Sequence, residues 1–193
     1  DASPSLVKSN IEKIVKFLFS DAYDCKIDTP FETLSYKDAI NLYGTDKPDM
    51  RIIETLKDIS ELFNDTEINF LNEILDNGGL IKALHTEELL TRKQIDTLDA
   101  DIKEMGSNGL GWFKIDNNEI SGPLAKLLND SEKADILKFG SGTLIFQAGE
   151  INSIAQYLDF IRRTIFKPSS NEMYSFVWIE DFPFFEYEDG KLQ

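Results

Sequence analysis

The sequence predicts an α+β fold that mixes helices with antiparallel strands. Three observations lead to this prediction: stretches with helical apolar spacing, short strand-like stretches beside turn residues, and no regular β-α-β alternation between them. The chain has 193 residues, of which 41% are hydrophobic and 14 are Phe, so it can bury a substantial core.

Two helices with clear start signals open the chain. Ser3 and Pro4 have the residue types of an N-cap and a first helical position, and apolar residues then recur at helical spacing. After a polar connector, Ser35 can cap a short helix that ends at Tyr43. Gly44 is then placed to stop this helix, because glycine readily adopts the left-handed conformation found there.

The next stretch predicts a helix and two strands. Apolar residues over 56–63 are spaced as in a helix, and the alternation over 67–75 favours a strand. A turn at 77–79 leads to a return strand over 80–84.

A capping box marks the clearest helix. Thr91 is followed three residues later by Gln94, which predicts a helix over 92–105 that Gly106 ends. The glycine-rich run at 106–111 follows a helix and precedes a strand, so we interpret it as a helix end and turn rather than a phosphate-binding loop.

The remaining patterns complete the α+β arrangement. We expect a strand over 112–115, a hairpin turn over 116–119, helices over 122–128 and 131–138, a strand over 143–147, a helix over 151–166, and a last strand over 174–179. A hairpin-like turn over 187–190 then closes the chain, and both chain ends are expected to be cut from a longer protein.

The charge is strongly acidic. The chain has 20 Lys and Arg against 35 Asp and Glu, a net charge of −15, so general affinity for nucleic acid is not expected. Arg162, Arg163 and Lys167 form the only compact basic group and are the candidate tRNA contact, although a helix dipole also favours cations at this helix end. The sequence leaves open whether Arg92 and Lys126 converge on them.

No catalytic residue and no metal ligand emerge from the residue types. His85 is the only histidine, and we expect it to be structural and exposed to solvent. The single cysteine, Cys25, excludes an intrachain disulfide and favours a reducing compartment. No apolar run reaches the length of a membrane span, so we expect a cytoplasmic protein without membrane contact.

Several blocks resemble those of bacterial-type, class II aspartyl-tRNA synthetases. Residues 34–51 contain Tyr-Gly-Thr-Asp-Lys-Pro-Asp-Met-Arg, which is similar to the family's Tyr-Gly-Ser-Asp-Lys-Pro-Asp-Leu-Arg. Leu-Thr-Arg-Lys-Gln at 90–94, Gly-Pro-Leu-Ala-Lys at 122–126 and Trp-Ile-Glu-Asp-Phe-Pro at 178–183 resemble further blocks in the family's order. Residues 145–149 depart from the family's pattern.

This resemblance implies a division into three parts. Residues 1–65 would be a segment of the class II catalytic core, 66–166 the GAD insertion domain, and 167–193 a return strand into the core. The B subunit of the tRNA-dependent amidotransferase shares the GAD domain but would lack the flanking core segments. The alternative to a ligase fragment is an acidic GAD-type module, related to that subunit, which docks to a protein partner without catalysis.

The resemblance also implies the chemistry of the parent enzyme. Such an enzyme, expected to be a homodimer, activates aspartate with ATP and Mg²⁺ and passes the aspartyl group to tRNA. The family's ATP-binding motifs would lie outside this chain, so we expect the chain to be inactive alone and to hold no cofactor, with the rest of the synthetase as its partner. Its signature residues are expected to fix the junction between core and insertion: Tyr43, Gly44, Asp46, Lys47, Pro48, Asp49, Arg51, Asp181, Phe182 and Pro183.

Overall fold

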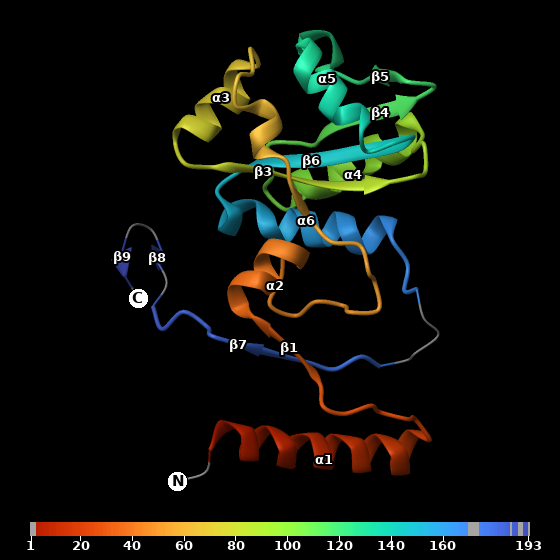
Figure 1. Ribbon diagram of the computed structural model, residues 1–193, viewed down its shortest axis with the longest axis vertical. Coiled ribbons are helices and arrows are strands. Elements are labelled where there is room, and N and C mark those ends of the chain that lie inside the picture. Colours follow the sequence, from red (N-terminus) through yellow and green to blue (C-terminus); the bar gives the residue numbers. More distant parts are fainter. Residues whose placement is uncertain (1–2, 170–173, 186, 189–190, 193) are drawn as a thin grey trace.

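The computed structural model describes residues 3–169, 174–185, 187–188 and 191–192, and it confirms the α+β class. The main elements are α1 (Pro4–Tyr23), β1 (Glu32–Ser35), α2 (Tyr36–Tyr43), β2 (Lys57–Asp58), α3 (Asn69–Asp76), β3 (Leu80–Thr86), α4 (Arg92–Glu104), β4 (Gly111–Asp116), β5 (Glu119–Ser121), α5 (Asp130–Leu137), β6 (Gly142–Gly149), α6 (Ile151–Ile165), β7 (Val177–Glu180), β8 (Tyr187–Glu188) and β9 (Lys191–Leu192). Figure 1 shows an upper body around a sheet, α6 and α2 below it, and a lower layer that ends in α1.

The upper body is built on a five-stranded antiparallel sheet in the order β2-β3-β6-β4-β5. The central strand β6 pairs with β3 along its length, from Thr143 opposite Thr86 to Gly149 opposite Leu80. Because β2 belongs to this sheet, the upper body takes in residues ahead of the boundary that the sequence suggested at residue 66.

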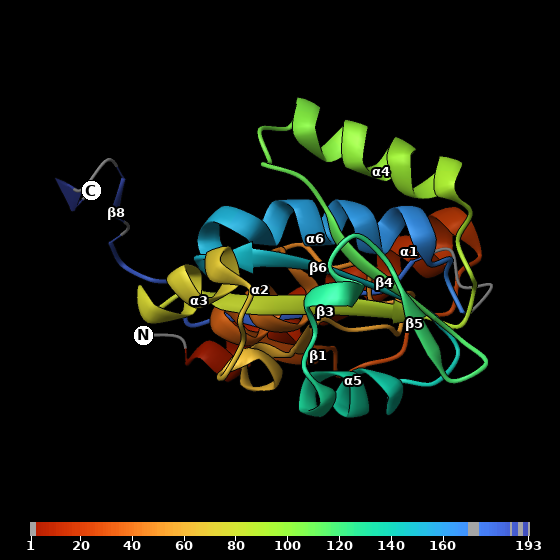
Figure 2. The same ribbon diagram turned by 90° about the horizontal axis from the view of Figure 1, so that it is seen from above.

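Alternation along the strands supplies two separate cores. Ile81 and Phe113 pack on one face with α3 and α5, whereas Leu84 and Ile145 pack on the other face with α4 and α6. Figure 2 shows this division, with α4 and α6 on one side of the sheet and α5 on the other. All four of these sheet residues are at most 1% exposed.

A two-stranded sheet lies below α2 and differs from expectation. β1 and β7 pair in parallel, with Glu32 opposite Val177 and Ser35 opposite Glu180. The sequence predicted antiparallel strands in general, and of this pair it predicted only the later strand, over 174–179, so β1 was missed. A parallel pair needs a long crossover between its strands, and here the whole upper body forms that crossover. Helix α2 contacts both strands on one side and α6 on the other.

Helix α1 is held to this layer by a buried carboxylate and by the ring of Phe19, which packs edge-on against Tyr174 and Phe176. Glu12 is 9% exposed, and its Oε1 accepts hydrogen bonds from the backbone N–H of Phe31 at 3.0 Å and from Nε1 of Trp178 at 2.9 Å. Lys8 adds an ion pair with Glu180 at 2.7 Å. These contacts use one side of α1 only.

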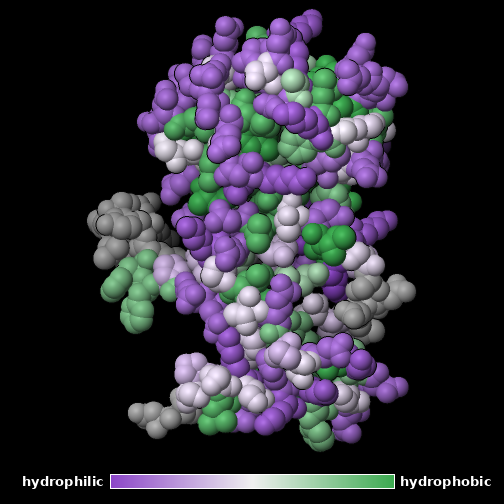
Figure 3. All heavy atoms as spheres, viewed as in Figure 1, coloured by the Kyte–Doolittle hydropathy of each residue, from purple (hydrophilic) through white to green (hydrophobic). Residues whose placement is uncertain are grey.

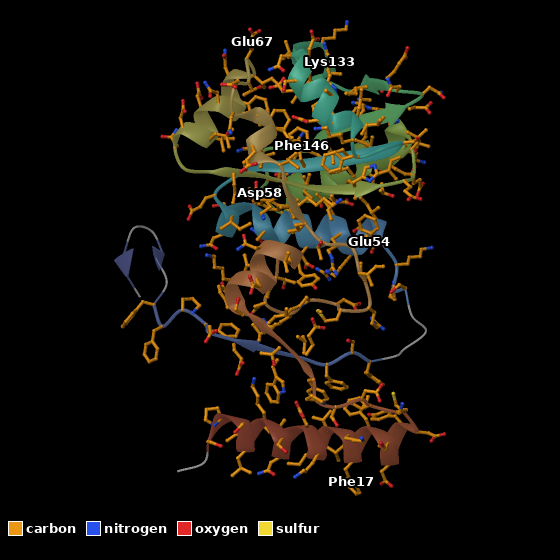
Figure 4. All side chains as sticks on the ribbon, viewed as in Figure 1. Phe17, Glu54, Asp58, Glu67, Lys133 and Phe146 are labelled. Carbon is orange, nitrogen blue, oxygen red and sulfur yellow. The ribbon has the colours of Figure 1, made fainter. Side chains whose placement is uncertain are left out.

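The other side of α1 exposes large apolar side chains. Ile14, Phe17 and Leu18 are 58%, 68% and 51% exposed. Figure 4 shows Phe17 on the side of α1 that points away from the rest of the chain. In Figure 3, hydrophobic atoms reach the surface along α1, while hydrophilic side chains cover much of the upper body. Among the described residues, no helix has both the length and the apolar character required to cross a membrane.

The predicted helix caps are confirmed. The side chains of Ser3 and Ser35 accept hydrogen bonds from the first turns of α1 and α2, and Gly44 ends α2 in the left-handed conformation. Thr91 and Gln94 form the complete capping box of α4. The turn after β4 and the helices α5 and α6 are also found close to their predicted positions.

Three predicted elements were wrong. The strand expected over 67–75 is helix α3, because Ile68, Leu71 and Leu75 have helical spacing and pack on the same core. The helix expected over 56–63 is strand β2 followed by a 3₁₀ turn (Ser60–Phe63), since the N–H of Ile81 donates to Ser60 Oγ and ties this stretch to β3.

The third error is the helix expected over 122–128, which is reduced to a 3₁₀ turn at Ala125–Leu127. Leu128 ends it in the extended conformation, and Asn129 then forms the N-cap of α5. The first two residues of the turn predicted over 187–190 form strand β8, which pairs with β9. The other two, Asp189 and Gly190, lie outside the described part of the chain.

His85 is half-buried rather than exposed, because its ring lies against Phe139 with centroids 5.8 Å apart. Burial is the main reason that the pKa of His85 is lowered, with the charge of Lys57 adding to the effect.

Candidate functional site

The signature block over 43–51 begins at the tight crossing of α2 and α6. Gly44, at φ +76°, lies so close to α6 that a Cβ atom there would be 2.4 Å from the carbonyl oxygen of Ala155. Only glycine provides both the left-handed conformation and this approach. Tyr43, the last residue of α2, is buried beside it.

Arg162 of α6 holds the chain that follows. Its side chain is 0% exposed and donates hydrogen bonds to the backbone carbonyls of Glu54 at 2.6 Å, Asp49 at 3.0 Å and Ile52 at 2.5 Å. The guanidinium also lies over the ring of Tyr43, 4.8 Å from its centroid. Arg162 therefore fixes the path of residues 49–54 into the upper body.

This burial removes Arg162 from the candidate tRNA contacts. A side chain without exposed surface, whose Nε and Nη2 donate to backbone carbonyls, is not available to a phosphate, and its Nη1 is buried without a hydrogen bond among the described residues. Burial lowers the pKa of Arg162, although arginine remains protonated at neutral pH. Figure 4 shows Glu54, one of the residues it binds, beside α6 at the boundary between the upper body and the layer below.

The signature residues Asp49 and Arg51 form a two-pronged ion pair. Arg51 donates from Nε to Asp49 Oδ1 at 2.8 Å and from Nη2 to Oδ2 at 2.7 Å. The hydrogen bond from Arg51 is the main cause that holds the pKa of Asp49 below its usual range. The pair is partly exposed and stiffens the turn that Pro48 begins, where the proline is itself buried.

A second pair lies on α6. Arg163 contacts Asp159 Oδ2 through Nη2 at 2.8 Å, one helical turn apart. Asp159 is 7% exposed, and burial raises its pKa despite the nearby arginines. Its other oxygen, Oδ1, makes no hydrogen bond within the part of the chain that the structure describes.

These groups line a shallow cavity of 530 Å³ between the signature loop and α6. The lining includes Lys47, Arg51, Asp159, Arg163 and Tyr174. Lys167 lies nearby, because Ser169, two residues on, donates from its backbone N–H and its hydroxyl to the carbonyl of Arg51 at 2.8 and 3.0 Å. The structure thus brings one of the three predicted basic contacts, Arg163, to the same cavity as Lys47, and it ties the segment that carries Lys167 to Arg51.

The second part of the signature lies elsewhere. Asp181, Phe182 and Pro183 follow the end of β7, where Asp181 turns the chain with φ +57°. The ring of Phe182 is 4.9 Å from that of Tyr36, the first residue of α2. The two parts of the signature therefore contact opposite ends of α2.

Arg92 and Lys126 do not line the cavity. Arg92 lies at the start of α4, 5.6 Å from the ring of Trp112, and lines a separate open cleft of 890 Å³ that Trp112, Tyr157 and Phe70 border. Lys126 lies in the 3₁₀ turn before α5. Within the described ranges, no three His, Cys, Asp or Glu side chains are placed to hold a metal ion.

Sequence reasoning missed two features of this site. The structural role of Arg162 could have been read from its spacing, because it falls four residues after Leu158 on the apolar face of α6. The place of Lys47 beside Arg163 had no such signal, since more than a hundred residues separate them and only the fold brings them together.

Comparison with known proteins shows what this chain is similar to. Residues 71–158 match the model of the GAD domain. The chain is 35% identical to an aspartate–tRNA(Asp/Asn) ligase of Hydrogenobaculum over 94% of its length. It is 33% identical to an aspartate–tRNA ligase of Thermosipho africanus over 93% of its length and 30% identical to that of Lactobacillus acidophilus over 98%.

The matches extend through both flanks of the GAD domain, so the alternative of a module related to the amidotransferase subunit is not favoured. The chain spans about a third, 32%, of the length of each of these three relatives. We conclude that this chain contains a GAD domain and that, together with the segments on either side of that domain, it is similar to about a third of the length of aspartate–tRNA ligases.

Proposed function

We propose that the chain serves as an integral third of a cytoplasmic, homodimeric aspartate–tRNA ligase. The parent enzyme activates aspartate with ATP and Mg²⁺ and transfers the aspartyl group to tRNA. ATP and Mg²⁺ bind to segments of the ligase outside this chain, which is inactive alone. The chain contributes the GAD domain and the junction that sets its position.

The observation that carries this proposal is the anchoring of the signature loop by Arg162. A buried guanidinium on the last helix of the GAD region binds three carbonyls of the segment that leads into that region. Hydrogen bonds from a charged donor are among the stronger ones in proteins. The signature residues around Arg162 act as a rigid joint, with Gly44 and the Asp49–Arg51 pair on its two sides.

The lower layer supports the same proposal. Parallel strands occur almost only in sheets whose faces are covered, and β1 and β7 form a parallel pair beside an α1 that exposes a row of apolar side chains. The relatives are about three times as long as the chain, which leaves ample protein to cover this layer. We assign these surfaces to contacts with the rest of the catalytic body.

A graft tests the proposal. The aligned third of the Hydrogenobaculum relative is replaced by this chain, and aspartate-dependent ATP–pyrophosphate exchange and aspartylation of tRNA are measured. The control is the same relative with the segment deleted, and the isolated chain is assayed alongside. We expect both activities in the graft and neither in the control or the isolated chain. Exchange by the isolated chain would refute the proposal.

A further inference from the structure

The cavity beside the signature loop is unusual in its charge. Its lining carries three basic side chains, Lys47, Arg51 and Arg163, and two acidic ones, Asp49 and Asp159. The described groups therefore sum to a formal charge of +1, on a chain whose net charge is −15. The lining of this cavity is therefore basic on balance, unlike the chain as a whole.

The acidic side chains of the cavity form ion pairs with its arginines. Asp49 accepts both prongs of Arg51, and Asp159 is 93% buried beside Arg163. The remaining contact is loose, because Lys47 Nζ lies 3.4 Å from Asp46 Oδ1. The positive charge available to a ligand therefore comes mainly from the lysine ammonium groups and from the exposed part of the Arg163 guanidinium.

These basic groups are also accessible. The side chain of Lys47 is 86% exposed, that of Arg163 is 54% exposed, and Lys167 is exposed. They are carried by stiff backbone: Lys47 precedes buried Pro48, Arg163 follows the Arg162 anchor, and the Ser169 hydrogen bonds hold the segment of Lys167 to Arg51. Because this backbone is already ordered, binding a phosphate adds no cost for ordering the backbone.

We propose that Lys47, Arg163 and Lys167 bind backbone phosphates of the tRNA at this cavity. The inference rests on the proposed function, because the ligase supplies the RNA. Lysine binds phosphate as a point charge, and exposed cations beside a shallow surface suit a phosphate backbone better than an enclosed small molecule. Tyr174 also lines the cavity, and its ring packs against that of Phe19 of α1, with centroids 4.7 Å apart.

The test measures binding of fluorescent tRNA to the 193-residue chain by anisotropy, from 25 to 300 mM salt. The variant Lys47→Ala/Lys167→Ala is compared with Lys93→Ala/Lys138→Ala, which removes two exposed lysines elsewhere. Lys138 pairs with Asp135 as Lys47 does with Asp46, so the two variants are matched in charge and in ion pairs. Circular dichroism confirms that both are folded.

Each lost phosphate contact lowers the slope of log affinity against log salt by about 0.9. This corresponds to about an eight-fold loss per contact at 0.1 M salt relative to 1 M, and to about sixty-fold for two. We expect this loss in the cavity variant and less than a three-fold change in the matched control. Equal losses in the two variants, or no binding by the unmodified chain at 25 mM salt, would overturn the proposal.

Two further measurements distinguish tRNA from a free nucleotide as the ligand, and failure of this site from failure of the proposed function. ATP at 5 mM should not displace the tRNA, and displacement that depends on Lys47 and Lys167 would instead assign the cavity to a free nucleotide. In the graft, the cavity variant should raise the KM for tRNA while ATP–pyrophosphate exchange is unchanged. Exchange with an unchanged KM would reject this site but leave the proposed function standing, whereas loss of exchange in the unmodified graft would reject the function.

Discussion

Arg162 is the residue on which the junction depends most, so its replacement by methionine is the most informative single change. Methionine keeps the length of the aliphatic stem but removes all donors. The carbonyls of Asp49, Ile52 and Glu54 would then lose their charged donor in a place where the arginine side chain is 0% exposed. The contact with the ring of Tyr43 would be lost as well.

The expected cost follows from these contacts. A hydrogen bond from a charged donor contributes about 1.5 to 3 kcal/mol, and a buried cation–π contact adds about 1 to 2 kcal/mol. Relief from burying the charge offsets part of the sum. We therefore expect Arg162→Met to lower the free energy of unfolding by about 4 kcal/mol. Arg162→Lys should lose about half as much, because an ammonium cannot reach three carbonyls in the fork geometry of a guanidinium.

Urea unfolding followed by circular dichroism measures this loss. With an m value of about 2 kcal/mol per molar, the midpoint should fall by about 2 M. Arg92→Met is the matched control, because Arg92 is 68% exposed in an ion pair with Asp96, and such pairs contribute about 1 kcal/mol or less. A loss below about 1 kcal/mol for Arg162→Met at an unchanged m value would refute the anchoring role.

Three further predictions test the parts around this anchor. Gly44→Ala should destabilise the chain by at least about 2 kcal/mol more than Gly78→Ala in urea, because both glycines have φ near +80° but only Gly44 meets a backbone atom; equal losses would contradict this. The destabilisation caused by Asp49→Asn should be constant above about pH 5 and shrink below about pH 4, because a carboxyl with a lowered pKa loses its stabilising charge as pH falls through its folded pKa; equal destabilisation at pH 7 and pH 3 would contradict the ion pair. Glu12→Ala should speed tryptic cleavage within α1 about ten-fold or more, whereas Glu12→Gln, which keeps an oxygen acceptor, should change it much less; similar rates in both variants would show that Glu12 does not hold α1.

Local signals in the sequence were sufficient for the elements that local chemistry determines. The caps at Ser3, Ser35 and Thr91 and the glycine at the end of α2 were predicted correctly, because each satisfies backbone groups within a few residues. The wrong predictions concern segments whose conformation depends on contacts with residues distant in the sequence. Ser60 takes its conformation from β3, and the parallel direction of β1 and β7 depends on the whole upper body between them.

The candidate site likewise combines features that the local sequence predicts with features that depend on the tertiary fold. The signature block located the junction, but the sequence grouped Arg162 with Arg163 and Lys167 as surface cations. The helical phase of α6 separates them, since it turns Arg162 toward the carbonyls of the signature loop and leaves Arg163 at the surface. Lys47 joins the cavity only through the tertiary fold, so no spacing along the chain could have predicted it.

The most direct test of the account is aspartate-dependent ATP–pyrophosphate exchange by the graft in which this chain replaces the aligned third of the Hydrogenobaculum relative. The account predicts exchange at least ten-fold above the relative with the segment deleted, and a further loss of that exchange when the graft carries Arg162→Met. Exchange no greater than that of the deletion control, from a graft that is folded and dimeric, would contradict the claim that this chain is an integral part of the ligase.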